Sequence, residues 1–353
     1  MPVKIGNIDA MDISNLKIVV VLPCYRSKGH VLDVIGRIGP EVSLIIAVDD
    51  ACPDGTGDHI KAGCADPRVE VVRNEVNIGV GGAMVHGYRI ALERGADIVV
   101  KVDSDGQMDP ALLMRIAYPI VAGHADYAKG NRFFNIEDLR TMPKLRLFGN
   151  AVLSFLTKLS SGYWNVFDPT NGYTAIHRVA LNLLPLDKID HSFFFESDIL
   201  FRLNIIGAVV VDVPIRARYA DEHSNLSVGQ VLVPFLLKNL RNFFKRLFYR
   251  YYLRDLNIGS LELVIGIVLL LFGLVFGVKE WIRAAAEGVT ASAGTVMLAG
   301  LPILVSVQMV LGFFSFDFVA VPRVPLQTIL AFPQRAKKRA PSKSGKSPES
   351  PLR

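Results

Sequence analysis

The sequence has 353 residues, enough for one large domain or two modest ones. Hydrophobic residues make up 51% of it, and the mean hydropathy of +0.34 is high for a soluble protein. Charge is divided unevenly, because residues 1–230 carry 23 Lys and Arg against 27 Asp and Glu, whereas residues 231–353 carry 16 against 6. A basic surplus confined to an apolar half favours anionic membrane lipids as partners and argues against nucleic acid.

The chain contains three cysteines, Cys24, Cys52 and Cys64. Their spacing matches no zinc-binding motif, and an odd number cannot form a complete set of disulfides. We therefore expect reduced thiols and an N-terminal half that faces the cytoplasm.

Apolar, β-branched runs alternate with segments of helical spacing through the first hundred residues. We expect strands at 17–23, 42–50, 69–73 and 98–102, with helices at 31–38 and 81–94. A repeat of about 25–30 residues predicts an α/β fold with a doubly wound, mostly parallel sheet and right-handed crossovers. Further strands are expected at 127–133, 173–176 and 208–214, and further helices at 145–159 and from 193.

The apolar run Ile98–Val102 ends in two carboxylates, Asp103 and Asp105. Ligands of open α/β sheets bind beyond the carboxyl ends of the strands. Two aspartates at i and i+2 on a turn can face one divalent cation, and their hard oxygen atoms suit Mg²⁺ or Mn²⁺. An isolated pair of this kind is more often a solvated turn. Here Asp49 and Asp50 end a second strand, and the convergence of four carboxylates on one edge favours a site.

The stretch Gly79-Val80-Gly81-Gly82 suggests a dinucleotide-binding turn. That motif, however, follows the first strand of its fold and has a final glycine at a spacing that this chain lacks. The position of the glycines, together with the apolar C-terminal half, argues against a soluble dehydrogenase. We interpret the stretch as a tight turn whose backbone packs close to a nucleotide.

Between Val231 and Leu256, basic residues recur at steps of three or four among Phe, Leu and Tyr. This pattern predicts a helix with one cationic and one apolar face that lies in the membrane interface. A solvated helix packed on the sheet is the alternative. The basic residues are Lys238, Arg241, Lys245, Arg246, Arg250 and Arg254.

Two uncharged runs follow, Leu263–Val278 and Ala293–Phe316. With their apolar flanks, both are long enough to cross the ~30 Å of hydrocarbon in a bilayer. Basic residues precede the first run and follow the second, so the positive-inside rule places the catalytic half and both termini in the cytoplasm. We expect an integral protein of the cell inner membrane, with Gly273 and Gly277 spaced for self-association through the membrane helices.

These patterns divide the chain into four parts. We expect a cytoplasmic catalytic domain at 1–228, an amphipathic juxtamembrane helix region at 229–256, two transmembrane helices at 257–318, and a basic tail at 319–353. The Ser- and Pro-rich composition of the tail is typical of disorder.

Taken together, these features resemble the polyprenyl-phosphate glycosyltransferases, which are inverting enzymes of the GT-A fold related to dolichol-phosphate-mannose synthase and to bacterial undecaprenyl-phosphate sugar transferases. The resemblance covers about residues 16–226. Each matching stretch is short, but their order and spacing match as a set. They are Leu22-Pro23-Cys24-Tyr25, Val48-Asp49-Asp50, Pro53-Asp54-Gly55-Thr56, Asn77-Ile78-Gly79-Val80-Gly81, Asp103-Ser104-Asp105, Gly130-Asn131-Arg132 and Glu196-Ser197-Asp198.

The resemblance implies a nucleotide-sugar donor site at the first strand ends. Pro23, Tyr25, Asp50 and Asp103 would bind the nucleotide. Asp103 and Asp105 would hold Mg²⁺ or Mn²⁺, which neutralises the departing diphosphate, and Asp105 therefore also counts as catalytic. Members of this family commonly have Asn-Glu after the tyrosine, whereas this chain has Arg26-Ser27, so the polar contacts near the nucleotide differ.

The resemblance also implies an acceptor site for the phosphate of a polyprenyl phosphate. Arg132 matches the arginine that holds this phosphate, and Lys129 and Arg218 are candidates to assist it. Glu196 and Asp198 occur where inverting relatives carry their catalytic carboxylate. Because a phosphate nucleophile is already ionised near neutral pH, either residue could orient the acceptor rather than act as a strong base.

The resemblance therefore implies transfer of a single sugar, with inversion, from a nucleotide sugar to a polyprenyl phosphate of undecaprenyl or dolichyl type. A second hypothesis is a membrane-anchored binding or scaffold protein that keeps the fold without the activity. Relatives that have lost activity tend to lose their acidic groups, but this chain retains Asp50, Asp103, Asp105, Glu196 and Asp198. A processive polysaccharide synthase is a third, although the Gln-x-x-Arg-Trp stretch of such enzymes does not occur here and two spans make a poor channel.

Overall fold

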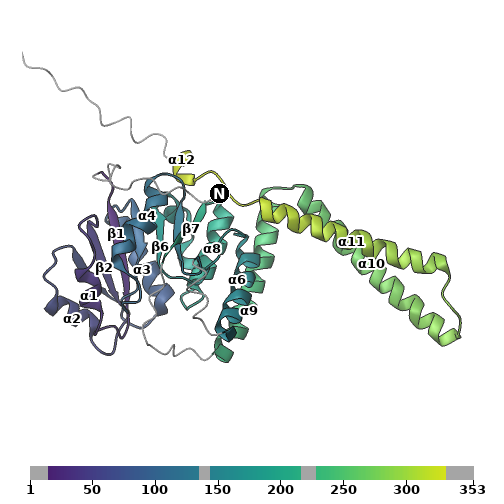
Figure 1. Cartoon of the computed structure of the whole chain (residues 1–353), viewed down its shortest axis with the longest axis horizontal. Coiled ribbons are helices and arrows are strands. Elements are labelled where there is room, and N and C mark those ends of the chain that lie inside the picture. Colours follow the sequence, from purple (N-terminus) through teal and green to yellow (C-terminus); the bar gives the residue numbers. More distant parts are fainter. Residues whose placement is uncertain (1–14, 135–143, 216–227, 331–353) are drawn as a thin grey trace, which may run out of the picture.

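The computed structural model describes residues 15–134, 144–215 and 228–330. Within these ranges an α/β unit is followed by two long helices that extend away from it as a hairpin (Figure 1). The strands are β1 (Ile18–Cys24), β2 (Leu44–Asp49), β3 (Val69–Arg73), β4 (Ile98–Lys101), β5 (Tyr127–Asn131), β6 (Thr174–His177) and β7 (Val210–Pro214). The α-helices of the α/β unit are α1 (Val31–Gly36), α2 (Thr56–Gly63), α3 (Gly79–Glu93), α4 (Leu113–Val121), α6 (Lys144–Ser161), α7 (Arg178–Leu183) and α8 (Phe195–Ile206). They are followed by α9 (Val228–Phe248), a π-helical turn η4 (Tyr249–Arg254), α10 (Ile258–Glu287), α11 (Ala293–Val319) and α12 (Leu326–Leu330).

The strands form one sheet in the order β3-β2-β1-β4-β6-β5-β7. All neighbouring pairs are parallel except the two that involve β6, which runs antiparallel to β4 and β5. The prediction of a mostly parallel, doubly wound sheet is therefore confirmed. The antiparallel β6 separates the half of the sheet that begins the chain from the half that holds β5 and β7.

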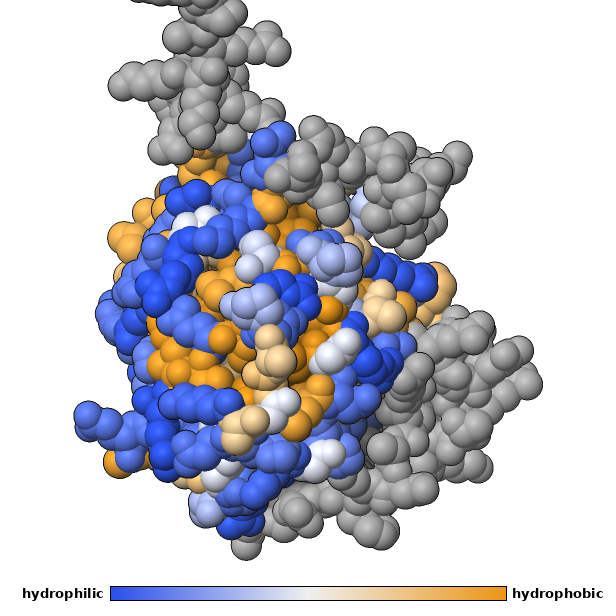
Figure 2. Space-filling model, turned by 90° about the vertical axis from the view of Figure 1, so that its left-hand side faces the viewer, coloured by the Kyte–Doolittle hydropathy of each residue, from blue (hydrophilic) through white to orange (hydrophobic). Residues whose placement is uncertain are grey.

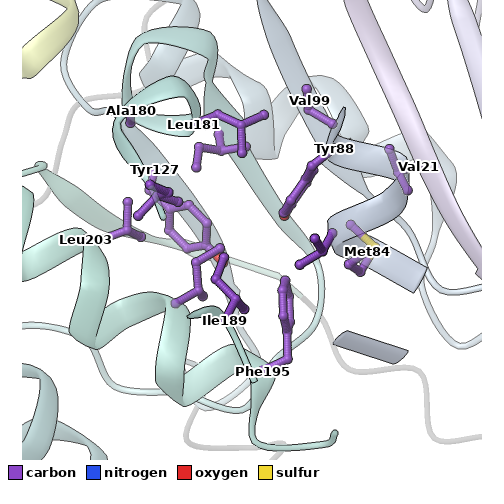
Figure 3. Close-up of a cluster of buried hydrophobic side chains, with 14 of the residues drawn as sticks. Val21, Met84, Tyr88, Val99, Tyr127, Ala180, Leu181, Ile189, Phe195 and Leu203 are labelled. Atoms are coloured by element: carbon purple, nitrogen blue, oxygen red, sulfur yellow. The ribbon is translucent and has the colours of Figure 1, made fainter. Parts of the chain in front are cut away.

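Both faces of the sheet are buried, which explains why β1, β2 and β4 are largely unbroken apolar runs rather than alternating ones. Val19 and Val21 of β1 face one hydrophobic cluster, and Val20 of the same strand faces the other. In the first cluster α3, α7 and α8 cover the sheet (Figure 3). Tyr88 of α3 and Phe195 of α8 meet there with ring centroids 6.3 Å apart, so α8 is fixed directly against the sheet and α3.

The helices α2 and α4 are among those that lie where the sequence indicates none. The helix α2 begins at Thr56, inside the turn-rich stretch 51–57, with Gly55 before it at a φ of +70°. The helix α4 contains Pro119, a residue that normally argues against a helix interior. Both helices cover apolar residues of the sheet, and this burial outweighs the unfavourable local signals.

The two C-terminal helices α10 and α11 are long and apolar enough to cross a membrane. They pack on each other, and the glycines of α10 allow the close approach. A Cβ on Gly273 would lie 2.6 Å from an Ile303 side-chain atom, and one on Gly266 would lie 3.2 Å from Val310. These glycines therefore pack within the chain, and self-association through the hairpin remains a prediction.

Both ends of the hairpin lie against the α/β unit, and its tip at 288–292 is distant from it (Figure 1). Asp317, near the end of α11, contacts Arg246 of α9, and after α11 the backbone N–H groups of Leu326 and Gln327 donate to the buried Asp126 carboxylate. The range 320–330 is thus part of the packed structure, which corrects the expectation of a disordered tail from 319. The rest of that tail, 331–353, lies outside the described residues.

The helix α9 is amphipathic, but the basic residues of α9 and η4 do not form the single cationic face that the sequence predicted. Arg246 is fully buried against Asp317, and Arg250 donates to Asn204 Oδ1 at 2.7 Å. The pattern of basic residues could not reveal this, because the acidic partner lies 71 residues away. Apolar side chains are nevertheless exposed along α9 and η4, namely Val233, Leu236, Leu237, Leu240, Phe244, Phe248 and Leu253.

Exposed hydrophobic residues are concentrated at the hairpin end of the described chain. Of the large hydrophobic side chains that are exposed, eight precede residue 216 and all others follow residue 232. On the opposite end of the molecule, hydrophilic residues surround a central area of hydrophobic ones (Figure 2). The distribution matches a protein that meets an apolar environment on the side of α9, α10 and α11.

Candidate active site

The carboxyl ends of β1, β2 and β4 meet at one edge of the sheet. Cys24 pairs with Asp49 across β1 and β2, and Val21 pairs with Lys101 across β1 and β4. The turn that carries Asp103 therefore leaves the sheet beside the loops that follow β1 and β2. This is the edge at which parallel α/β sheets bind ligands.

Ser104 fixes the turn after β4. Its buried hydroxyl lies 2.7 Å from the Pro23 carbonyl oxygen and 2.8 Å from Ser27 Oγ. Gly106 completes the turn at a φ of +81°, which favours glycine. The sequence indicated Ser27 only as a departure from the family pattern, and the only signal for Ser104 was its position between two carboxylates.

Asp103 and Asp105 provide two carboxylates on this turn. Lys101 Nζ lies 2.8 Å from Asp103 Oδ1, and the Gln107 N–H donates to Asp105 Oδ1 at 3.0 Å. Among the described residues, no three or more His, Cys, Asp or Glu side chains are grouped to hold a metal ion. Two hard oxygen donors fit Mg²⁺ or Mn²⁺ if diphosphate oxygens and water complete its ligands. The pair is therefore suited to a cation shared with a nucleotide.

Backbone strain occurs in the two loops beside this turn. Arg26, after β1, has a φ of +54°, and Ala51, after β2, has a φ of +49°. Such values are uncommon for residues other than glycine and cluster at ligand sites. The exposed ring of Tyr25, predicted to bind the nucleotide, lies next to this strain, with the Arg26 guanidinium 5.4 Å from its centroid.

Asp50 is buried and holds the stretch Gly79-Val80-Gly81-Gly82, which we call the glycine turn and which forms the start of α3. Its carboxylate accepts hydrogen bonds from Asn74 Nδ2 at 2.8 Å, from the Ile78 N–H at 3.0 Å and from the Gly79 N–H at 2.9 Å. Protein donors thus take up much of the carboxylate that was predicted to bind the nucleotide.

The glycine turn packs closely against the backbone of Asp190 and His191. The N–H groups of Gly81 and Gly82 both donate to the His191 carbonyl oxygen. A Cβ on Gly81 would lie 2.2 Å from the Asp190 carbonyl oxygen. The close approach expected toward a nucleotide is therefore made toward the loop before α8. The turn thereby positions the start of the helix that carries Glu196.

Glu196 and Asp198 are only two residues apart in the sequence, but their side chains contact different groups. Glu196 Oε1 lies 3.1 Å from Lys101 Nζ, so this carboxylate joins the group around Asp103. Asp198 Oδ2 pairs with Arg202 Nε at 2.8 Å, and its Oδ1 accepts from Asn242 of α9 at 3.0 Å. The sequence could not separate the two, whereas in the structure Glu196 is the one that lies with Lys101 and the Asp103 turn.

The predicted acceptor residues lie around β5. Arg132 Nε pairs with Asp168 Oδ2 at 2.9 Å and its Nη2 with Oδ1 at 3.2 Å, and the arginine side chain remains 33% exposed. Lys129 is fully buried, with Nζ donating to the Asn171 carbonyl oxygen at 2.9 Å. Asp168, which orients Arg132, was not among the predicted site residues. Arg218 lies outside the described residues.

A row of polar side chains crosses the sheet from the Asp103 turn toward Arg132. Lys101 pairs with Thr174, Thr174 with Lys129, and Lys129 with Asp212, so the four residues occupy adjacent strands at one level. Burial lowers the pKa of Lys129 to about 8 and raises the pKa of Asp212 to about 6. Shifted pKa values of this kind are typical of functional sites.

The sequence matches the family model described as Glycosyl transferase family 2 over residues 20–184. It is 32% identical over 204 residues to an undecaprenyl-phosphate mannosyltransferase of Micrococcus luteus, a match that covers 57% of this chain and 83% of that protein. A polyprenol monophosphomannose synthase of Mycolicibacterium smegmatis is also 32% identical, over 56% of this chain and 75% of its own length. A UDP-N-acetylglucosamine–dolichyl-phosphate N-acetylglucosaminyltransferase of Methanococcus voltae is 30% identical, over 58% and 86%.

Solved structures agree with these relatives on the fold. A glucosyl-3-phosphoglycerate synthase from Mycobacterium tuberculosis, in complex with Mn²⁺, UDP and glucosyl-3-phosphoglycerate, superposes with a TM-score of 0.51 at 20% identity, over 67% of this chain and 84% of that one. This structural similarity shows that the chain has the GT-A fold. With its seven-stranded sheet, its strand-end aspartates and these relatives, the chain belongs to glycosyl transferase family 2, among the polyprenyl-phosphate glycosyltransferases.

Proposed function

We propose that this protein transfers one sugar from a nucleotide-sugar donor to the phosphate of a polyprenyl phosphate, with inversion, at the cytoplasmic face of the membrane. The observation that carries the proposal is an aromatic surface that joins the acceptor arginine to the membrane hairpin. We define this surface by Phe133, Phe155, Trp164, Phe167 and Phe318, which are exposed or half-buried.

The aromatic surface begins at the arginine. The Arg132 guanidinium lies 5.7 Å from the Phe133 ring centroid, and the Phe133 and Phe167 centroids are 6.1 Å apart. Ser154 of α6 donates to the Phe167 carbonyl oxygen at 2.8 Å, which places α6 beside this pair. An exposed run of aromatic rings next to a phosphate-binding group suits an acceptor that is anionic at one end and apolar beyond.

The aromatic surface ends at the hairpin. Phe155 of α6 lies 6.4 Å from Trp164 between ring centroids, and Trp164 lies 4.1 Å from Phe318 at the end of α11. A polyprenyl chain with its phosphate at Arg132 can therefore follow aromatic rings to the membrane-spanning helix. A water-soluble acceptor would have no use for such a path.

The proposed reaction is a direct displacement. An oxygen of the acceptor phosphate attacks the anomeric carbon of the donor sugar, the bond from that carbon to the diphosphate breaks, and the nucleoside diphosphate leaves. Attack from the opposite face inverts the anomeric configuration. Arg132, held by Asp168, would orient the acceptor phosphate through its planar guanidinium. Glu196 would orient the reacting groups from the side of Lys101.

The donor diphosphate would lie at the turn after β4. Asp103 and Asp105 would hold Mg²⁺ or Mn²⁺, and this cation would neutralise charge on the leaving group. Structures of the mycobacterial glucosyl-3-phosphoglycerate synthase contain Mn²⁺ in several cases and Mg²⁺ in another, which supports a divalent cation in this fold. Pro23 and Tyr25 would contact the nucleotide from the loop after β1.

The membrane arrangement follows from the hairpin. Its two ends lie beside the α/β unit, so we infer that both termini share the side of the catalytic domain. Basic residues around the hairpin ends favour the cytoplasmic side. The exposed apolar residues of α9 would enter the interface, with the exposed Arg241 available to anionic lipid headgroups.

The test measures transfer of radiolabel from a panel of nucleotide sugars to undecaprenyl phosphate by the full chain in detergent, with Mg²⁺, with Mn²⁺ and with EDTA. Asp105→Ala is compared with the parent. Asp58→Ala is the matched control, because Asp58 is exposed on α2 and contacts only Arg73 among the salt bridges described here.

Lipid-extractable label that disappears with EDTA and in Asp105→Ala, but not in Asp58→Ala, is the expected result. Label that survives both treatments contradicts the role of the cation. A parent that neither transfers label nor binds any nucleotide overturns the enzymatic proposal and leaves a membrane-anchored scaffold.

A further inference from the structure

Lys101 is a buried cation in the middle of the sheet. It is the last residue of β4, between β1 and β6, and its side chain is only 2% exposed. Burial of an ammonium group in this position costs free energy unless carboxylates pair with it. The partners of Lys101 therefore indicate why a lysine occurs in an otherwise apolar strand.

The Lys101 ammonium bridges two carboxylates from distant parts of the chain. Its Nζ lies 2.8 Å from Asp103 Oδ1 and 3.1 Å from Glu196 Oε1. Asp103 belongs to the donor turn, and Glu196 lies in the first turn of α8, 95 residues after Lys101. The Glu196 side chain is 12% exposed, so water screens its interaction with Lys101 weakly.

Gly172 provides the room for this bridge. A Cβ on Gly172 would lie 2.3 Å from Lys101 Nζ and 2.9 Å from Asp103 Oδ2. The backbone of Gly172 does not adopt the positive φ that favours glycine, so space rather than conformation accounts for the residue. The ammonium group is thus packed against backbone, and its position is fixed.

One positive charge between two negative ones has opposite consequences for the two partners. Lys101 holds the Glu196 carboxylate against the donor turn. At Asp103 the same ammonium competes with any divalent cation for a carboxylate oxygen. Loss of Lys101 is therefore expected to misplace Glu196 and, at the same time, to strengthen cation binding at Asp103.

We propose that Lys101 is a positioning residue that fixes Glu196 relative to the donor turn and lowers the affinity of Asp103 for a divalent cation. The proposal rests on the function proposed above. Lys101 acts through the two carboxylates rather than on the substrates.

The experiment uses the full chain in detergent and three variants, Lys101→Met, Glu196→Gln and the double variant. Lys17→Met is the matched control, because Lys17 contacts the Arg94 carbonyl oxygen just before β1, at the opposite edge of the sheet. Two kinds of measurement are made. Steady-state kinetics give kcat and KM for the donor that the transfer assay identifies, and electron paramagnetic resonance gives the affinity for Mn²⁺ alone.

Lys101→Met is expected to lower kcat roughly 30- to 100-fold with the donor KM within about threefold of the parent value. In the Glu196→Gln background the same change is expected to cost less than about threefold more, because its effect passes through Glu196. Mn²⁺ affinity is expected to rise roughly three- to tenfold, because a neighbouring positive charge is removed. A lysine needed only for packing would leave Mn²⁺ affinity unchanged or lower it.

The proposal is overturned if kcat of Lys101→Met stays within about threefold of the parent, if the two losses multiply in the double variant, or if Mn²⁺ binds no more tightly. A parent without transfer activity would instead show that the proposed function has failed, and the Mn²⁺ measurement then decides on Lys101 alone. Lys101→Gln, which keeps a polar group at the site, is the second variant should Lys101→Met not fold.

Discussion

Arg246 and Asp317 form an ion pair that is completely buried where the hairpin meets the α/β unit. Both side chains are 0% exposed, with Nη1 2.6 Å from Oδ1 and Nη2 2.9 Å from Oδ2. Trp164 Nε1 donates to the same carboxylate at 2.8 Å, and the Tyr251 hydroxyl donates to it as well. A single carboxylate near the end of α11 thus joins α9, η4 and the segment after α6.

Arg246→Met is expected to destabilise the protein strongly. Removal of the arginine leaves Asp317 buried without its cation, which typically costs about 3–5 kcal/mol. Thermal unfolding in detergent measures the effect. The control is Arg241→Met, an exposed arginine of the same helix, for which a change below about 0.5 kcal/mol is expected. Equal effects of the two substitutions would contradict the importance of the buried pair.

Glu196→Gln and Asp198→Asn are expected to separate activity from stability. Glu196→Gln should lower kcat roughly 100-fold or more with little change in the unfolding temperature, because its carboxylate lies in the site. Asp198→Asn should chiefly lower the unfolding temperature, because it breaks the pair with Arg202. Steady-state kinetics and thermal unfolding of both variants provide the comparison, and a reversed pattern would exchange the two assignments.

The aromatic surface can be tested through acceptor length. Phe155→Ala combined with Phe167→Ala is expected to raise KM for undecaprenyl phosphate about tenfold, because apolar contact with the chain is lost. KM for a short, water-soluble isoprenyl phosphate should change little. Leu183→Ala, which alters an exposed apolar residue of α7, is the control. An equal rise of KM for both acceptors would place the long chain elsewhere.

Asp212 predicts a pH dependence of stability. Burial raises the pKa of Asp212 to about 6 in the folded state, so protonation of this carboxyl favours folding. The free energy of unfolding therefore falls as the pH rises from about 4 to about 6. A shift of this size corresponds to on the order of 3 kcal/mol. Asp212→Asn, which stays neutral, should be more stable than the parent at pH 7.5 and similar to it at pH 4. Denaturant unfolding at the two pH values checks this, and a gain at pH 4 as large as that at pH 7.5 would argue against it.

The sequence predicted the parts of the site that depend on local pattern. Apolar runs that end in acid placed Asp50 and Asp103 at one edge of a parallel sheet, and the structure confirms that β1, β2 and β4 end there together. Strand polarity and burial on both faces leave direct traces in the order of residues.

Contacts between distant segments left no such trace. The sequence treated Glu196 and Asp198 alike, and only the packing of α8 against α9 directs one toward Lys101 and the other toward Asn242. The glycine turn was assigned to a nucleotide, although its close neighbour is the backbone of His191. Arg246 matched the periodicity of a cationic surface, and periodicity alone cannot tell a side chain that meets solvent from one that meets a buried carboxylate.

The return of the chain to Asp126 after the second long helix limits how the catalytic unit can turn. A domain on a single linker can swing about that linker, and relative motion of this kind is the usual expectation. Here the α/β unit is attached at η4, before α10, and again at α12, after α11. With two separate attachments, the α/β unit can rotate relative to the hairpin only about the line that joins them. The directions in which the Asp103 edge can tilt relative to the hairpin are thereby limited by the fold itself.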